Sequence, residues 1–441
     1  MIDFWASAKQ RLELIQPIHR EGVVLDLVGL ILLVKLPGAF VGEICRIYPK
    51  RKDVEFLHAK VVGFRENNAL LMVLGSSVGV HCGCRVMATG LTTSVQVSPV
   101  MLGRLLDGAG LPLDDLPVIS GGIAVSAHPA PLAPLQRAEI NQVFSTGIKA
   151  IDALLTLGKG QRMGLFANAG VGKSSLLNSI CQHRAGQGDL IVLALIGERG
   201  REVRECYQQL KQSGALHRTV IIAATAEQPA LLRIQALYTA LAVAEYFSAQ
   251  QQDVTLVVDS MTRFAMALRD VGLAIGEAPT LRGYTSSVFS VLPEVIERCG
   301  AFESRGAITG LFSVLVEGEL QQDPAADAMK AVLDGHLVLS PQLAEKEHYP
   351  AIDVLKSVSR LFPQLATPQH RQQSRKLRQV WSRFEEQKHM LAMGLGESES
   401  ASILKADMQR IKGFVTQDRS ELINYEASLI ALEQLGLETQ I

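Results

Sequence analysis

The sequence lacks an excess of charge of either sign, because 43 Lys and Arg side chains nearly balance 44 Asp and Glu side chains. A formal net charge of -1 at pH 7 gives no global positive field for holding nucleic-acid phosphates. Aromatic residues are also few between residues 22 and 90, which argues against a platform on which bases stack. We therefore expect no nucleic-acid partner.

Long apolar runs are missing as well. The first 20 residues mix charged and apolar side chains and contain no continuous apolar stretch of the kind found in secretory signals. The longest apolar run, residues 23–36, contains Asp26 and is too short to span a bilayer. We expect a cytoplasmic protein.

Cysteine is sparse, with six residues scattered over 441 positions, which excludes a dense disulfide framework. His81, Cys82 and Cys84 lie close together in sequence, but no second Cys/His cluster at ligand spacing accompanies them. A structural role for these three residues is therefore favoured over a metal site.

The N-terminal part of the chain has two different patterns. Residues 1–20 predict an amphipathic helix, which either packs on its own domain or docks a partner. Short strand-like runs separated by turn residues follow, at residues 22–29, 30–36, 59–65, 69–75 and 85–90. This pattern is typical of a small β-barrel or sandwich, which we place at residues 21–95.

The middle of the chain alternates short apolar strands with helical segments, after a Gly- and Pro-rich connector at residues 91–150. The strands are expected at residues 162–167, 189–197, 219–226 and 254–260. Such alternation favours an α/β domain with a largely parallel sheet, here residues 96–350. No strand-like run follows residue 350, so residues 351–441 are expected to form an all-helical domain.

The stretch FANAGVGKSS, residues 166–175, resembles the phosphate-loop pattern G-x-x-x-x-G-K-[ST], with Ala167 in place of the first glycine. A strand precedes it and a helix follows it, so successive backbone N–H groups favour an anion. We expect Lys173 to reach the β- and γ-phosphates of ATP and the Ser174 hydroxyl to bind Mg²⁺. The predicted nucleotide-binding residues of the loop are Ala169, Gly170, Val171, Gly172, Lys173, Ser174 and Ser175.

Two further strands end in carboxylates. The run at residues 254–260 delivers Asp259, a candidate for the metal site. The run at residues 189–197 leads into Glu198, Arg199 and Glu202. One interpretation is that these three residues form a helix N-terminus with ion pairs on the surface. The other is that Glu198 activates the attacking water while Arg199 and Glu202 support the metal–water network.

Several longer segments resemble the hexameric rotary-type ATPases, the group that holds the ATP synthase α and β subunits. Within this group they are similar to the export ATPases of flagella and type III secretion systems. The segments are TGIKAIDALLTLGKGQRMGLF, LIGERGREV, VVDSMTRFAMALRDVGLAIGE, and LDGHLVLS followed by HYPAID. The resemblance covers residues from about 20 to 365 and implies an N-terminal β-barrel, a central RecA-like P-loop ATPase domain and a helical C-terminal domain.

The resemblance also implies roles for individual residues. Glu198 matches the catalytic carboxylate, and Asp259 matches the second carboxylate of the metal site. Arg199 and Arg263 match arginines that line the catalytic site. Tyr349 matches the aromatic residue that stacks on adenine.

Arg360 matches the arginine finger, which reaches into the site of a neighbouring subunit. Because the catalytic carboxylate and the finger occur in one chain here, a homo-hexamer could complete its own sites. The resemblance further implies a central stalk protein, a peripheral stator-like regulator at the N-terminus, an export gate and chaperone–substrate complexes as partners. It places the protein peripherally at the inner-membrane export apparatus.

The expected function is hydrolysis of Mg-ATP to energise type III protein export, in the flagellum rather than in a virulence injectisome. An injectisome ATPase is the first alternative. A Rho-like RNA translocase and a subunit like ATP synthase β are the others, although the first would need a basic, aromatic N-terminal domain.

Overall fold

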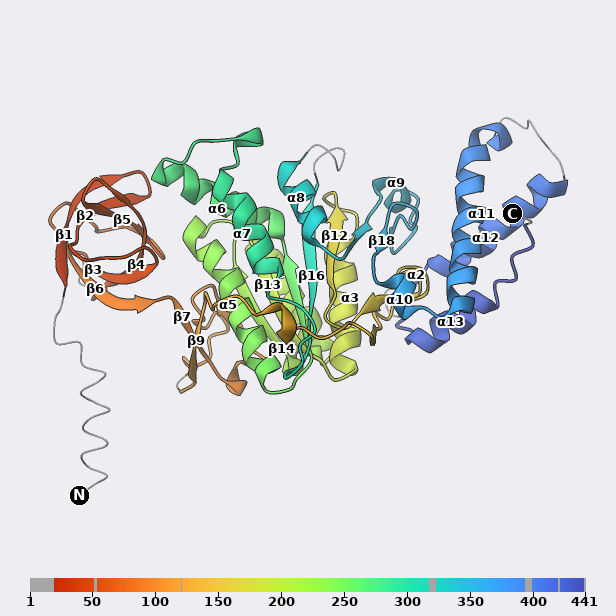
Figure 1. The fold of residues 1–441 in the computed structure, drawn as a ribbon, viewed down its shortest axis with the longest axis horizontal. Helices are drawn as coiled ribbons and strands as arrows, with labels where there is room; N and C mark the ends of the chain where they lie inside the picture. Colours follow the sequence, from red (N-terminus) through yellow and green to blue (C-terminus); the bar gives the residue numbers. More distant parts are fainter. Residues whose placement is uncertain are drawn as a thin grey trace, which may run out of the picture. The chain divides into compact units, whose positions relative to one another are not determined.

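The computed structural model describes residues 20–50, 54–119, 121–316, 323–392, 399–418 and 421–439 (Figure 1). The predicted docking helix at residues 1–20 lies outside the described residues apart from Arg20. The chain divides into two compact units. One contains the N-terminal barrel with residues 229–232 and 270–278, and the other contains the central sheet and the C-terminal helices.

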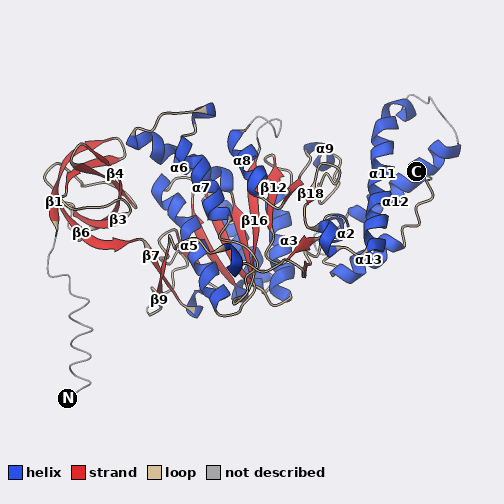
Figure 2. Ribbon diagram, viewed as in Figure 1, coloured by secondary structure: helices blue, strands red, loops and turns tan. Residues whose placement is uncertain are grey.

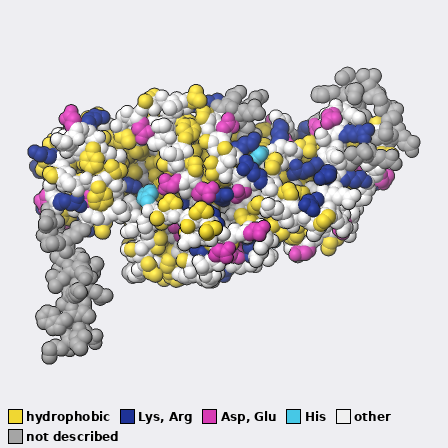
Figure 3. Space-filling model, in the orientation of Figure 1, with side chains coloured by type: hydrophobic (Ala, Val, Ile, Leu, Met, Phe, Trp, Pro, Cys, Tyr) yellow, Lys and Arg dark blue, Asp and Glu magenta, His cyan; other side chains and the backbone are white. Residues whose placement is uncertain are grey.

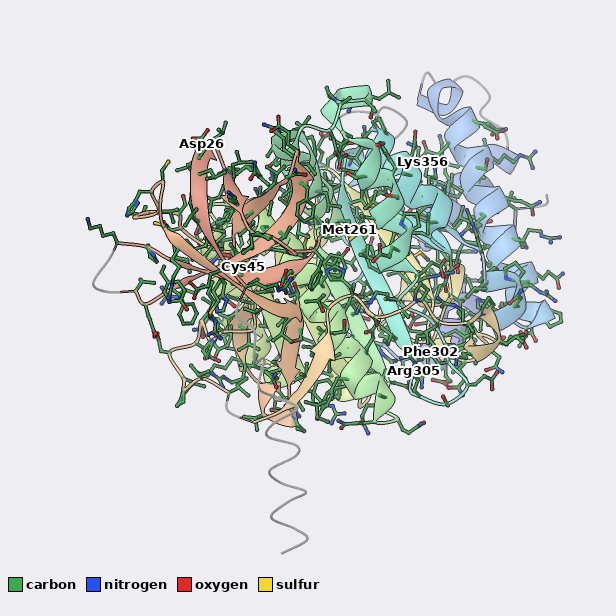
Figure 4. All side chains as sticks on the ribbon, turned by 60° about the vertical axis from the view of Figure 1, so that its left-hand side comes forward. Asp26, Cys45, Met261, Phe302, Arg305 and Lys356 are labelled. Carbon is green, nitrogen blue, oxygen red and sulfur yellow. The ribbon has the colours of Figure 1, made fainter. Side chains whose placement is uncertain are left out.

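The N-terminal unit is a closed, antiparallel six-stranded barrel, which confirms the predicted barrel. Its strands, in the order β1-β2-β5-β4-β3-β6, are β1 (Glu21–Val28), β2 (Ile31–Lys35), β3 (Glu43–Tyr48), β4 (Leu57–Arg65), β5 (Asn68–Val73) and β6 (Arg85–Thr92). Strand β3 was not predicted, although its alternation is clear: Cys45 and Ile47 are buried between more exposed neighbours. Cys45 lies within the barrel wall and Asp26 on its exposed surface (Figure 4).

The central domain contains an eight-stranded sheet in the order β18-β17-β12-β16-β15-β13-β14-β8. The strands are β8 (Leu105–Asp107), β12 (Arg162–Ala167), β13 (Leu190–Ile196), β14 (Thr219–Ala224), β15 (Val254–Asp259), β16 (Ile308–Leu315), β17 (Gly335–Val338) and β18 (Val358–Ser359). Every neighbouring pair is parallel except β17 with β18. The predicted α/β domain is therefore confirmed.

Helices cover both sides of this sheet (Figure 2), which is why all seven residues of β13 are buried. On one side, Leu193 of β13 belongs to the same apolar cluster as Ile180 of α3 and Leu210 of α4. The helices of the domain are α2 (Lys149–Leu154), α3 (Lys173–Gly186), α4 (Gly200–Gln212), α5 (Ala230–Ala249), α6 (Met261–Ile275), α7 (Ser286–Ile296), α8 (Pro324–Val332) and α9 (Pro341–Ala344).

Two expectations about this region are wrong. The connector at residues 91–150 contains β8, which is the edge strand beside β14, and also β7 (Ser94–Val97), β9 (Ile123–Ser126) and β10 (Val143–Phe144). A strand also follows residue 350, because β18 pairs with β17. Both β8 and β18 are very short. They are defined by their pairing with a strand that is distant in sequence, and not by a long apolar run of their own.

Just before β16, the Arg305 guanidinium stacks 3.9 Å from the centre of the Phe302 ring (Figure 4).

The C-terminal part is helical, as predicted. Its helices are α10 (Phe362–Leu365), α11 (Pro368–Ala392), α12 (Glu399–Val415) and α13 (Tyr425–Glu433). Leu377 and Trp381 of α11 are buried in one apolar cluster with Leu404 and Ile411 of α12, and that cluster continues into the central domain. The predicted domain boundaries at residues 95/96 and 350/351 stay predictions. The first helix of the C-terminal part begins at Phe362.

The described helices include none that is both long and apolar enough to cross a membrane. On the face shown in Figure 3, acidic and basic side chains are interspersed, in keeping with the near-zero net charge of the chain.

Candidate active site

The carboxyl ends of β12, β13 and β15 meet at one edge of the sheet, because these strands are parallel. A cavity of about 540 Å³ opens at this edge. Most of the predicted site residues line it, namely Ala169, Gly170, Lys173, Ser174, Ser175, Glu198, Arg199, Glu202, Asp259 and Arg263. Residues from three separate parts of the sequence, 169–175, 198–202 and 259–263, are thus brought together.

The loop between β12 and α3 has the backbone conformation that a phosphate loop needs. Gly170 and Gly172 have φ angles of 81° and 89°, in the left-handed region that favours glycine. A Cβ atom at Gly170 would meet nothing within 4 Å, so the backbone there is open. Ala167, which replaces the usual first glycine, is the buried last residue of β12 and has room for its methyl group.

Lys173 lies between two carboxylates. Its Nζ donates a hydrogen bond to Asp259 Oδ1 and lies 3.7 Å from Glu198 Oε1. Asp259 Oδ1 also accepts a hydrogen bond of 2.6 Å from the hydroxyl of Ser313 on β16. Sequence reasoning does not identify Ser313, because it lies inside an apolar strand and only the neighbouring strand shows its contact.

The Glu198 carboxyl is electrostatically unusual. Burial, the negative charge of Asp259 and a hydrogen bond with Glu202 raise its pKa to about 7, while the Lys173 ammonium lowers it. A carboxyl with a pKa near neutrality is suited to accept a proton from a bound water molecule. These contacts favour the catalytic interpretation of Glu198 over a surface ion pair.

The residues present fit a magnesium ion held partly by its substrate. Among the residues that the structure describes, no three His, Cys, Asp or Glu side chains form a metal-binding group. Mg²⁺ in nucleotide sites uses one or two protein oxygens together with phosphate and water, and the exposed Ser174 hydroxyl and the Asp259 carboxylate supply that chemistry.

Two predicted arginines reach the cavity by different routes. Arg199 is largely exposed and lies 3.8 Å from Glu202, in the first turn of α4. Arg263, on α6, packs directly on Gly197, where an added Cβ atom would lie only 2.8 Å from the Arg263 Cβ. Gly197 was not predicted as a site residue, although its place at the end of β13 shows why no side chain is tolerated there.

Tyr349 and Arg360 lie outside this cavity. Tyr349 lines a neighbouring hollow with Val171, Gly172 and Ser175, and its ring carbon Cε1 is 3.4 Å from the position of a Cβ at Gly172. Arg360 is exposed and follows β18, and its backbone N–H donates to the Asp334 carbonyl at 2.9 Å. The chain thus brings Tyr349 beside the phosphate loop but does not bring Arg360 into the cavity.

Comparison with known protein families assigns each part of the chain. Residues 147–359 match the nucleotide-binding domain of the ATP synthase alpha/beta family, and residues 24–90 match the beta-barrel domain of that family. Residues 366–434 match the T3SS EscN ATPase C-terminal domain.

Individual relatives agree with this assignment. The chain is 40% identical to the flagellum-specific ATP synthase of Bacillus subtilis over 96% of its own length and 97% of the relative. It is also 40% identical to the type 3 secretion system ATPase of Xanthomonas euvesicatoria, over 93% of each protein.

A solved structure is also similar: the assembled ATPase EscN in complex with its central stalk EscO, from the type III secretion system of enteropathogenic E. coli. It has a TM-score of 0.84 and 36% identity, over 94% of this chain and 99% of that one. These matches favour neither an RNA translocase nor an ATP synthase β subunit. The chain belongs to the ATP synthase α/β family and, within it, to the ATPases of flagellar and type III secretion export.

Proposed function

We propose that this chain hydrolyses Mg-ATP as a homo-hexamer and energises protein export through the bacterial flagellum. One observation carries the catalytic part. The Glu198 carboxyl, with a pKa raised to about 7, lies beside Lys173 and Asp259 in a cavity that also contains the phosphate loop.

Each side chain of the cavity has a role in this proposal. The backbone from Ala169 to Ser175 and the Lys173 ammonium bind the phosphates. Mg²⁺, when bound, neutralises phosphate charge, and Ser174 and Asp259 would hold it directly while Glu202 supports it through water. Glu198 accepts a proton from the attacking water.

The arginines and the aromatic residue complete the site. Arg199 and Arg263 place positive charge at the cavity wall, where negative charge develops during phosphoryl transfer. Tyr349, beside Gly172, provides the surface on which the adenine ring stacks.

The proposal of a ring rests on the position of Arg360. This side chain is exposed and absent from the cavity of its own chain, so we assign it to the cavity of a neighbouring subunit. The similar EscN structure is of an assembled ATPase with a central stalk, which supports a ring around a stalk here. We further propose a regulator bound near the N-terminus, an export gate, and chaperone–substrate complexes as partners, with the ring peripheral to the inner membrane on its cytoplasmic side.

The assembly is tested by mixing two inactive variants. A Glu198→Gln ring lacks the base, and an Arg360→Ala ring lacks the finger. In mixed rings, about a quarter of the sites combine an intact Glu198 with an intact Arg360 from the next subunit. We expect activity to reappear on mixing, and a mixture as inactive as its parents would rule out a finger shared between subunits.

The choice of flagellum over injectisome rests on the amino-acid sequences of three short segments, MGLFA, AMA and LAIGE. The two relatives described above, one from each system, are equally similar to this chain. A strain whose own copy carries Lys173→Ala decides between the two systems. Loss of swimming with secretion of virulence proteins intact is expected, and the opposite result would assign the chain to an injectisome.

A further inference from the structure

The segment that follows α12 runs past Tyr349. Thr416 Oγ1 is hydrogen-bonded to Nδ1 of His348 at 3.2 Å, and the backbone N–H of Gln417 donates to the Tyr349 carbonyl at 2.9 Å. Two consecutive residues of the helical domain therefore hold two consecutive residues of the loop that carries the adenine-stacking aromatic ring.

The Gln417 side chain is buried, and both its amide oxygen and its amide nitrogen make hydrogen bonds. Only 5% of the residue is exposed. Its Oε1 accepts from the Lys149 backbone N–H at 2.8 Å, and its Nε2 donates to the carbonyls of Gly147, at 2.8 Å, and of Glu421. Because its oxygen accepts one hydrogen bond and its nitrogen donates two, this amide holds the segments around Gly147, Gln417 and Glu421 in fixed relative positions.

Gly147 connects this arrangement to the phosphate-loop helix. It has a φ angle of 79°, and a Cβ atom there would lie 2.8 Å from the ring of His183 on α3. Its carbonyl also accepts from the Ile423 N–H at 3.2 Å. The loop before α2 is thus packed against α3 on one side and hydrogen-bonded to the C-terminal tail on the other.

Gln417 also lines the hollow that contains Tyr349, Gly172 and Ser175. We propose that Gln417 is a positioning residue for the nucleotide base: it fixes Tyr349 relative to the phosphate loop and links both to the end of α12. The inference rests on the proposed function, since it takes Tyr349 as the base-stacking residue. Nucleotide affinity would then depend on the position of α12 and of the segment that follows it.

The proposal separates the base from the phosphates, and binding measurements can do the same. We would titrate the full-length protein with Mg-ADP and with Mg-pyrophosphate by calorimetry. Gln417→Ala removes the side-chain partner of the half-buried Lys149 N–H and of the buried Gly147 carbonyl. We expect about tenfold weaker binding of ADP. Pyrophosphate, which has no base, should bind as it does to the wild type.

The matched control is Gln409→Ala, which removes the same side chain from an exposed position of α12. It should change neither affinity. An unchanged ADP affinity in Gln417→Ala would overturn the proposal. An equal loss of ADP and pyrophosphate binding would also overturn it, because the residue would then support the domain in general and not the base.

Two more variants distinguish a failure of this inference from a failure of the proposed function. Tyr349→Ala should weaken ADP binding and spare pyrophosphate binding. If it does so while Gln417→Ala has no effect, the role of Gln417 is wrong and the base site stands. If Lys173→Ala leaves pyrophosphate binding intact, the proposed nucleotide site itself fails.

Thr416→Val covers the case in which Gln417→Ala does not fold. Thr416 is exposed, and the substitution removes only its hydrogen bond to His348 while keeping the shape of the side chain. We expect a loss of about two- to threefold in ADP affinity with pyrophosphate unchanged. Wild-type ADP affinity in this variant would overturn the proposal.

Discussion

The cavity at the ends of β12, β13 and β15 differs sharply from the edge of the sheet that carries Arg360. In the cavity, Lys173 and Asp259 are buried and joined by a hydrogen bond, and Glu198 lies close by. Arg360 is exposed behind the two-residue strand β18. One half of the proposed site is therefore organised within a single chain, whereas the other half, as proposed, would come from a neighbouring subunit.

The largest effect should come from the exposed half. If Arg360 acts as the proposed arginine finger, Arg360→Ala should lower kcat of the ring by about 10³- to 10⁵-fold. Because the side chain is exposed, the melting temperature and the ADP affinity of the isolated subunit should stay at wild-type values. Steady-state ATPase assays and thermal unfolding check both points.

The control for this variant is Arg375→Ala, which removes an exposed arginine of α11. It should leave kcat unchanged. If Arg360→Ala rings keep most of their activity, the exposed edge is not part of the active site and the contrast between the two halves disappears.

The buried half gives the next largest effect. Glu198→Gln should lower kcat by about 10²- to 10⁴-fold, the usual contribution of a general base. The same substitution should stabilise the nucleotide-free protein above pH 7. The folded-state pKa is raised from 4.5 to about 7, so ionisation of Glu198 destabilises the fold.

The size of this stability effect depends on pH. The destabilisation is absent below about pH 4.5, develops between 4.5 and 7, and is complete above pH 7. Thermal unfolding of both proteins from pH 5 to 8 should show the Gln variant gaining relative to wild type as pH rises. A constant difference would mean that the Glu198 pKa is not raised.

The two halves were also unequally predictable. Asp259 ends an apolar strand, and Glu198 and Lys173 lie two and six residues beyond the ends of such strands, in recognisable segments. Local sequence was therefore sufficient to place them at one sheet edge. Ser313 was missed because its partner belongs to another strand. Gln417 was missed because its contacts to Gly147 and Lys149 join residues about 270 positions apart, which no local pattern encodes.

The fold shows the same division. Long apolar runs such as β13 and β15 were predicted, and the short strands β8 and β18 were not. These two strands exist because a sheet edge offers them unpaired hydrogen-bonding groups, and only the tertiary structure provides that edge.

A smaller effect should follow from changing the environment of Glu198. The kcat/KM for ATP at saturating Mg²⁺ should rise with pH through about 7, because the base must be ionised. Glu202→Gln removes a negative neighbour that helps to raise the Glu198 pKa, so the rise should move to lower pH. Glu205→Gln, at an exposed position of the same helix, is the matched control and should leave the profile in place.

The smallest effect concerns the support beneath the buried half. Ser313 donates to Asp259 Oδ1, which also accepts from Lys173, so Ser313→Ala leaves that buried carboxylate with one hydrogen bond fewer. Loss of such a bond to a charged group costs about 1–3 kcal/mol of unfolding free energy. Denaturant unfolding measures this loss, and Ser290→Ala, which changes an exposed serine of α7, is the control.

Because Asp259 is proposed to hold Mg²⁺, the Mg²⁺ concentration for half-maximal ATPase activity should also rise in Ser313→Ala. If the unfolding free energy falls while this Mg²⁺ concentration stays constant, Ser313 stabilises the fold alone. The interior of β16 would then have no influence on Mg²⁺ binding at the end of the neighbouring strand.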